Sequence, residues 1–160
     1  TVGPGLRLLM VGLNPSLYAA DAGVGFARPG NRFWPAALAS GIVGLDRDPF
    51  AAFEAGVGMT DLVKRATVAA DELRAEEYVA GVARLDRLCA WLQPGAVCVA
   101  GLTGWRAAVD KRAGRGWQPT SLGGRPVYVM PNPSGLNARV SVADLAADLA
   151  AAAAGPPASG

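Results

Sequence analysis

Hydrophobic positions along the chain form short apolar runs that alternate with helical stripes. The run from Leu6 to Gly12 is almost continuously apolar and ends at a glycine, which is typical of a strand buried on both faces of a parallel sheet. The runs 96–101 and 126–130 have the same character, and a glycine or proline closes each of them. These patterns predict three buried strands.

Helical spacing lies between and after these runs. Residues 31–42 and 75–92 predict two helices, and the second is amphipathic because charged residues separate its apolar positions. Thr103 and Ser141 are suitable N-caps for helices over 103–108 and 142–153. The expected apolar stripes consist of Phe33, Ala36, Ala37 and Ala39 in the first helix, and of Val79, Val82, Leu85, Leu88, Cys89 and Leu92 in the second.

The alternation of strands and helices predicts an α/β fold with three layers, α/β/α, around a short and mainly parallel central sheet. Two Asn-Pro-Ser segments, 14–16 and 132–134, follow the first and last of these strands. Because ligands bind beyond the carboxyl ends of parallel strands, the two loops are expected to face each other across one cleft. Turn chemistry explains either copy alone, whereas two such loops together can hold a small planar ligand.

Length and composition favour one compact domain over residues 1–153, followed by a tail, 154–160, with the composition of a disordered segment. Hydrophobic residues make up 51% and charged residues 18%, which suits a soluble α/β enzyme. The apolar runs are shorter than the ~20 residues of a membrane span, so we expect no transmembrane helix. The first residues do not resemble a signal peptide.

The chain contains no histidine, and this absence is the strongest chemical constraint that composition supplies. It excludes Ser-His-Asp and Cys-His triads and most catalytic zinc sites. The two cysteines, Cys89 and Cys98, stand apart from each other and from other soft ligands, which argues against a zinc or iron–sulfur site. A net charge of +2 permits nucleic-acid binding only through a local basic surface.

Four blocks, VGLNPS, GFARPGNRFW, GMTDLVKRAT and MPNPSGLNAR, occur in this order between about Leu6 and Arg139. Together they resemble the mismatch-specific uracil/thymine DNA glycosylase family, of the bacterial G:U mismatch-specific type, within the uracil-DNA glycosylase superfamily. The resemblance implies a uracil-DNA glycosylase-like fold and a monofunctional enzyme of base excision repair. Such an enzyme flips deoxyuridine, preferably from G:U mismatches, out of double-stranded DNA and hydrolyses the N-glycosidic bond to release free uracil.

The resemblance also implies a monomer in the bacterial cytoplasm, associated with the nucleoid, that needs neither metal nor organic cofactor and no membrane. Monofunctional action agrees with the positions of the only lysines, Lys64 and Lys111, because both lie outside the two strand-end loops. A lyase would need an amine there to form a Schiff base.

Two residues are candidates for the chemical step. In the family the asparagine of the first block aligns the attacking water, which assigns that role to Asn14. A carboxamide orients water but does not take its proton near neutral pH. Asp61 stands where the family more often has asparagine or lysine, and a carboxylate there can act as general base or stabilise the sugar cation. The alternative is an ordinary N-cap or surface aspartate.

The base-binding candidates are Leu13, Phe26, Ala19, Tyr18 and Asn132. By resemblance, Phe26 stacks on the flipped base, and backbone N–H groups near Leu13 and Phe26 bind the uracil oxygens. Ala19 falls where the family has a small residue near the 5-position of the base, and Tyr18 beside it is bulkier than the family pattern. A methyl clash discriminates by only about 1–3 kcal/mol, so tolerance of thymine stays open. As a lone aromatic residue, Phe26 also suits a core.

The last block corresponds to the loop that enters the duplex. Leu136 is the candidate wedge that fills the space of the flipped nucleotide, and Gly135 and Asn137 offer polar groups to the opposite guanine. The family usually has serine followed directly by arginine here, so Asn137-Ala138 is a departure. Taken alone, Leu136 is an ordinary exposed leucine. The candidate phosphate contacts are Ser134, Arg28, Lys64, Arg65 and Arg139, with Lys111, Arg112 and Arg115 as further cations that equally suit a solvated surface.

Three alternatives remain. One is a glycosylase of the same superfamily with a broader or different substrate, such as single-stranded uracil, U:A pairs or a deaminated purine. Another is a nucleic-acid-binding domain without catalysis, which the intact first loop argues against. The third is a nucleotide-binding α/β domain, but the chain lacks both GxGxxG after the first strand and GxxxxGK[ST].

Overall fold

A computed structural model describes residues 1–158 and shows a five-stranded sheet in the order β2-β1-β3-β5-β4. The neighbouring strands are parallel except for the pair β4 and β5, which is antiparallel. The prediction of a mainly parallel sheet is therefore confirmed. The strands are β1 (Leu8–Gly12), β2 (Val57–Asp61), β3 (Ala96–Ala100), β4 (Gly116–Trp117) and β5 (Val127–Met130).

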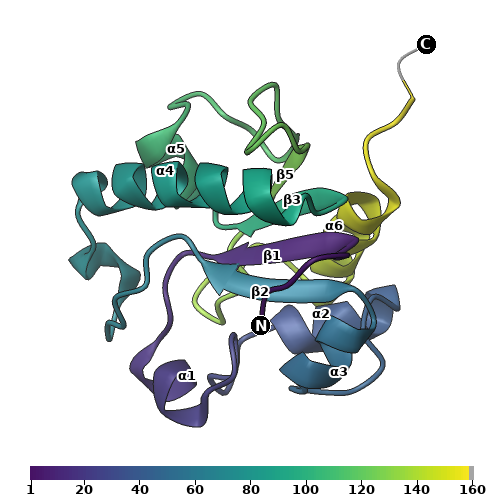
Figure 1. Cartoon of the computed structure of the whole chain (residues 1–160). Coiled ribbons are helices and arrows are strands. Elements are labelled where there is room, and N and C mark those ends of the chain that lie inside the picture. The colour runs from purple at the N-terminus through teal and green to yellow at the C-terminus, as the bar shows by residue number, and fades with distance from the viewer. Residues whose placement is uncertain (159–160) are drawn as a thin grey trace.

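Helices cover both faces of the sheet, so the three-layer α/β/α arrangement is confirmed as well (Figure 1). The helices α4 and α5 lie on one face and α2, α3 and α6 on the other. The chain leaves β1 at its carboxyl end and continues into α1, at the lower left of Figure 1. The helices are α1 (Leu17–Ala22), α2 (Phe33–Ser40), α3 (Pro49–Glu54), α4 (Ala75–Leu92), α5 (Leu102–Ala108) and α6 (Val142–Ala154).

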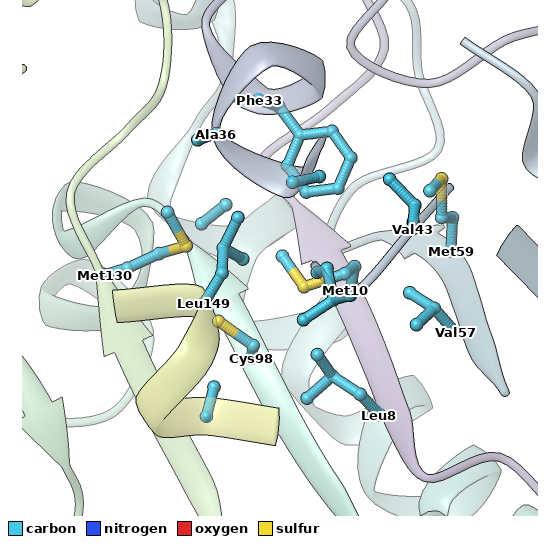
Figure 2. Close-up of a cluster of buried hydrophobic side chains, with 14 of the residues drawn as sticks. Leu8, Met10, Phe33, Ala36, Val43, Val57, Met59, Cys98, Met130 and Leu149 are labelled. Atoms are coloured by element: carbon cyan, nitrogen blue, oxygen red, sulfur yellow. The ribbon is translucent and has the colours of Figure 1, made fainter. Parts of the chain in front are cut away.

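Alternating side chains of the central strands fill two separate cores. In β1, Leu8 and Met10 face the α2 and α6 side, whereas Leu9 and Val11 face α4, and none of the four is exposed to solvent. Figure 2 shows the first core, with Phe33 beyond the tip of β1, above Met10 and Leu8. This core therefore continues to the carboxyl end of the sheet, where the two Asn-Pro-Ser loops begin.

The amphipathic helix over 75–92 has the predicted bounds and packs most of the predicted stripe on the core, but in its first turns the buried positions shift from Val79 to Tyr78 and Gly81. Its buried residues are Tyr78, Gly81, Leu85, Cys89 and Leu92, whereas Val79 is 53% exposed. Gly81 explains the shift, because a Cβ there would lie 2.1 Å from the carbonyl oxygen of Leu62. The helix thus packs its backbone directly on the segment after β2, and the stripe turns toward that contact.

Several predicted ends change in the structure. In α2 three of the four predicted stripe residues are buried. Trp34 is buried as well, whereas the fourth, Ala39, is exposed. Helix α5 begins at Leu102 with Gly101 at the N-cap, so Thr103 lies inside the helix and the predicted cap is wrong. Helix α6 extends to Ala154, one residue into the predicted tail; residues 159–160 of that tail lie outside the described residues. Within residues 1–158, no helix is both long and apolar enough to cross a membrane.

Candidate active site

A cavity of about 580 Å³ lies at the carboxyl ends of the parallel strands, and both Asn-Pro-Ser loops line it. Its volume is in the usual range for small-molecule sites. The structure brings together ten of the predicted site residues in its lining: Leu13, Asn14, Ala19, Phe26, Arg28, Asp61, Asn132, Ser134, Leu136 and Asn137. The remaining candidates, Tyr18, Lys64, Arg65, Gly135 and Arg139, are exposed residues outside that lining.

Asn14 uses the nitrogen end of its side-chain amide to bind the protein. The Nδ2 atom donates to Oγ1 of Thr67 at 2.7 Å and to the carbonyl oxygen of Arg65 at 3.0 Å, with a longer contact of 3.4 Å to the carbonyl of Pro15. Within the described residues, Oδ1 accepts no hydrogen bond. A free carbonyl oxygen therefore remains on a half-buried residue that lines the cavity.

The second asparagine of the paired loops binds with the opposite end of its amide. Oδ1 of Asn132 accepts from the backbone N–H of Ser134 at 2.9 Å, which is the local turn chemistry expected of Asn-Pro-Ser. Asn14 makes no such turn, because its Oδ1 accepts no backbone N–H from the described residues and its two shorter hydrogen bonds reach residues more than 50 positions away in sequence. The two loops share a sequence motif and one cavity, yet only the first presents a free carbonyl oxygen there.

Asp61 is the last residue of β2 and stands opposite Gly12 in the ladder with β1. A Cβ at Gly12 would lie 2.7 Å from Oδ1 of Asp61 and 3.2 Å from Cζ of Phe26. The missing side chain at Gly12 therefore lets the carboxylate and the aromatic ring approach each other over the end of β1.

Burial raises the pKa of the Asp61 carboxyl group, while the positive charges of Lys64 and Arg84 oppose this rise. Arg84 also donates to the backbone carbonyl of Asp61, which ties the end of β2 to α4. Among the described residues, no donor bonds to the carboxylate itself. The lone pairs of Asp61 thus remain available to take a proton in the cavity.

Phe26 occupies a loop that core residues hold in place. Its ring stacks on Phe33 with a centroid distance of 4.3 Å, and Trp34 donates from its indole nitrogen to the carbonyl of Gly25 at 2.8 Å. The backbone of Phe26 has a φ of 58°, an uncommon conformation for a bulky residue. Such strain is retained where the surroundings fix it, and here they place the aromatic ring beside Asp61.

The remaining base-binding candidates occupy different environments. Ala19 is buried at the wall of the cavity, whereas Tyr18 is 53% exposed. The side chain of Leu13 is buried, and a Cβ at Gly101 or Gly104 would lie within 2.5 Å of it. Its side chain therefore anchors the first loop on α5.

Leu136 stands at the rim of the cavity on a tight turn and is 88% exposed. The backbone N–H of Asn137 donates to the carbonyl of Ser134 at 3.0 Å, and Oγ of Ser134 accepts from the backbone N–H of Leu136 at 3.3 Å. A Cβ at Gly135 would lie 2.7 Å from the carbonyl oxygen of Gly30, so the turn rests on the segment before α2. Leu136 thus projects from a supported turn.

The guanidinium group of Arg32 supports this turn through hydrogen bonds to backbone carbonyls. It donates to the carbonyl of Ser134 at 2.9 Å and to the carbonyls of Asn137 and Val140. Arg32 is half-buried, and its guanidinium group is occupied by backbone carbonyls of the segment that carries Leu136, so its role is structural.

Arg32→Lys is expected to loosen the turn, because one ammonium group cannot reproduce a planar fork bound to three carbonyls. Amide hydrogen exchange in residues 134–140 should rise by about tenfold or more, while the amides of α4 remain unchanged. The matched control is Arg125→Lys, since Arg125 also donates to two backbone carbonyls, of Pro94 and Gly95, far from the cavity. Equal exchange in residues 134–140 of the wild type and Arg32→Lys would show that Arg32 does not support the turn.

The basic residues predicted as phosphate contacts or further surface cations divide, within residues 1–158, into two that bind a carboxylate and five that do not. Arg65 binds Glu77, with 2.8 Å between Nε and Oε1, and Arg115 binds the buried Asp148, with 2.7 Å between Nε and Oδ1. The Arg65 guanidinium, together with the backbone N–H of Arg74, lowers the pKa of Glu77 to about 2. The exposed candidates without a carboxylate partner in the described part of the chain are Arg28, Lys64, Lys111, Arg112 and Arg139.

Some residues that line the cavity were not among the predicted site residues. Thr67 and Val68 line the cavity from the segment after β2, and Thr103 lines it from α5. Thr67 belongs to the GMTDLVKRAT block, so the block marked the segment but not the contact with Asn14. Across residues 1–158, no group of three or more His, Cys, Asp or Glu side chains is arranged to hold a metal ion.

A comparison with protein families matches residues 1–151 to the uracil DNA glycosylase superfamily. The match covers the whole sheet, both strand-end loops and all the helices except the last turn of α6, and the chain belongs to this superfamily. Its members are DNA glycosylases, hydrolases of base excision repair that act on DNA containing uracil. The prediction of the superfamily and of its α/β fold is confirmed.

Proposed function

We propose that this chain is a monofunctional uracil-DNA glycosylase that flips deoxyuridine out of duplex DNA, preferably where uracil lies opposite guanine. It acts as a monomer and hydrolyses the N-glycosidic bond with a water bound by Asn14. The observation that carries the proposal is the amide of Asn14, whose nitrogen binds the protein and whose oxygen is left as an acceptor. That acceptor belongs to a cavity at the strand ends.

The proposed reaction separates the positioning of the water from its deprotonation. The bond between C1′ of the sugar and N1 of uracil breaks, and its electron pair leaves with the base. The sugar gains oxocarbenium character, and the water held by Asn14 Oδ1 forms the new bond to C1′. Its proton passes to the Asp61 carboxylate, which lies in the same cavity and is free of hydrogen-bond donors from the described residues.

Recognition of the flipped base is assigned to Phe26 and the first loop. Extraction of a base from the stack costs a few kcal/mol, and stacking on an aromatic ring contributes about 1–3 kcal/mol toward it. The Phe33 ring behind Phe26 fixes the stacking surface before DNA binds. Ala19 is buried in the wall of the cavity, and its small side chain leaves room there for the pyrimidine ring.

Recognition of the duplex is assigned to the turn over residues 134–137. Leu136 is exposed enough to enter the gap left by the flipped nucleotide, and the Arg32 contacts keep it in place. Asn137 donates from Nδ2 to the carbonyl of Asn132 at 3.3 Å, which leaves its Oδ1 as an acceptor for the donor groups of the opposite guanine. Arg28, Lys64 and Arg139 are the proposed phosphate contacts. Because they are so few, the affinity for DNA should depend only weakly on salt concentration.

The substrate is tested with four oligonucleotides that carry U:G, U:A, T:G or single-stranded uracil, followed by alkaline cleavage of abasic sites. We expect the highest single-turnover rate on U:G, and no strand breaks in a C:G control duplex. Equal rates on U:G and on single-stranded uracil would overturn the mismatch preference and the role of the turn. A chain that yields no breaks on any of the four substrates is not a uracil-DNA glycosylase.

A further inference from the structure

Thr67 connects the segment after β2 to the first loop through a buried hydroxyl group. The residue is 5% exposed, and its Oγ1 accepts from Asn14 Nδ2 at 2.7 Å and donates to the carbonyl of Ala69 at 2.8 Å. A hydroxyl has one proton, which the Ala69 carbonyl accepts. The Thr67 oxygen therefore faces Asn14 as an acceptor only.

The carbonyl of Arg65 is the second acceptor beside Asn14, at 3.0 Å from Nδ2. The two protons of the amide nitrogen thus satisfy two acceptors on one side of the side chain. A flipped amide would place its oxygen against the Arg65 carbonyl, and it could bond Thr67 only if that hydroxyl gave up the Ala69 carbonyl. The partners therefore select the orientation in which Oδ1 is free.

The segment that carries Thr67 is held independently of this hydroxyl group. Its backbone N–H donates to the carbonyl of Pro15 at 3.2 Å, and Ser16 pairs with Thr67 in a parallel bridge. On the two sides of Thr67, Arg65 binds Glu77, and the backbone N–H of Ala69 donates to a carboxylate oxygen of Glu72 at 2.7 Å. Loss of the hydroxyl group alone should leave the segment in place.

We propose that Thr67 is a positioning residue for the glycosylase reaction, whose hydroxyl group fixes the amide orientation of Asn14 and thereby the place of the attacking water. This inference rests on the proposed function and deepens it. Thr67 touches Asn14 and acts through it, so its removal should slow the chemical step while the affinity for DNA stays the same.

The kinetic test compares Thr67→Val, which keeps the shape and lacks the hydroxyl, with Thr67→Ser, which keeps the hydroxyl. The single-turnover rate on a U:G duplex should fall by about 10- to 100-fold in Thr67→Val and stay within about threefold of the wild type in Thr67→Ser. Affinity for a duplex with uncleavable 2′-fluoro-2′-deoxyuridine should change by less than about twofold. Thr120→Val, at an exposed threonine outside the cavity lining, is the matched control.

A double-mutant cycle shows whether the effect passes through Asn14. In an Asn14→Ala background, Thr67→Val should change the rate by less than about twofold. An undiminished effect in that background, or an equal loss in Thr67→Ser and Thr67→Val, overturns the inference. If Thr67→Val does not fold, Thr67→Ala replaces it as the variant without a hydroxyl.

A measurement without catalysis separates this inference from the proposed function. Side-chain amide protons of Asn14 can be assigned in ¹⁵N spectra by their loss in Asn14→Ala. We expect their exchange with water to accelerate by about 3- to 10-fold in Thr67→Val and to stay slow in Thr67→Ser. Unchanged exchange in Thr67→Val overturns the positioning role. A wild-type chain without activity overturns the proposed function, while this measurement still decides the role of Thr67.

Discussion

Asn14→Ala is expected to reduce the single-turnover rate of uracil excision from a U:G duplex by about 10²- to 10³-fold. The substitution removes the oxygen that binds the attacking water and leaves the Thr67 and Arg65 acceptors to solvent. It leaves the aromatic stacking of Phe26 on Phe33 and the contacts of the Leu136 turn intact. The loss should therefore appear in the chemical step.

Binding and folding measurements separate this loss from damage to the protein. Affinity for the uncleavable 2′-fluoro duplex should stay within a few-fold of the wild type, and Tm should change by only a few degrees. A variant that binds this duplex normally and excises uracil at the wild-type rate would show that Asn14 does not place the water.

Asp61→Asn is expected to slow the same step by about 10²- to 10⁴-fold and to change its dependence on pH. The wild-type rate should increase with pH as Asp61 loses its proton, and burial places that increase above the range of an ordinary aspartate. The variant has no ionisable group at this position, so its rate should lack this increase. Rates measured under single-turnover conditions across a pH series provide the test, and an unchanged profile would exclude a general base at Asp61.

Although Asp61→Asn should slow the reaction, it should stabilise the folded protein at neutral pH. Since the pKa of Asp61 is raised in the folded state, its contribution to stability is present at low pH and is lost as pH rises through that pKa. Asp61→Asn should therefore have a higher Tm than the wild type at neutral pH, and the difference should shrink as pH falls. Asp21→Asn, at an exposed aspartate of α1, is the control that should show no such trend.

The helices and strands that could be predicted from the sequence have long or uniform hydrophobic patterns. Those that could not be predicted lack such a pattern. The bounds of α4 follow from 18 residues of amphipathic spacing. β2 is an edge strand of five residues without a continuous apolar run, and its alternation of Val57 and Met59 with Gly58 and Thr60 is too short to mark a strand. α3 has only six residues, although Asp48 followed by Pro49 is a readable helix start.

The candidate site was predictable as far as the topology of the sheet determines it. Loops that follow parallel strands meet at one edge, so the two Asn-Pro-Ser segments were expected to share a cleft, and they do. The contact between Asn14 and Thr67 was not predictable, because it depends on how the irregular segment after β2 returns to the first loop. The ion pair of Arg65 with Glu77 likewise depends on where α4 packs.

The central proposal is that a water bound by Asn14 hydrolyses the N-glycosidic bond of deoxyuridine. The products of one turnover test it most directly. The wild-type chain, in excess over a U:G duplex, should release one free uracil per duplex, and the uracil-containing strand should stay intact until alkali cleaves it. Asn14→Ala should release uracil at least about 100-fold more slowly under the same conditions. Absence of free uracil, strand cleavage before alkali, or equal release by the two proteins would contradict the proposed reaction.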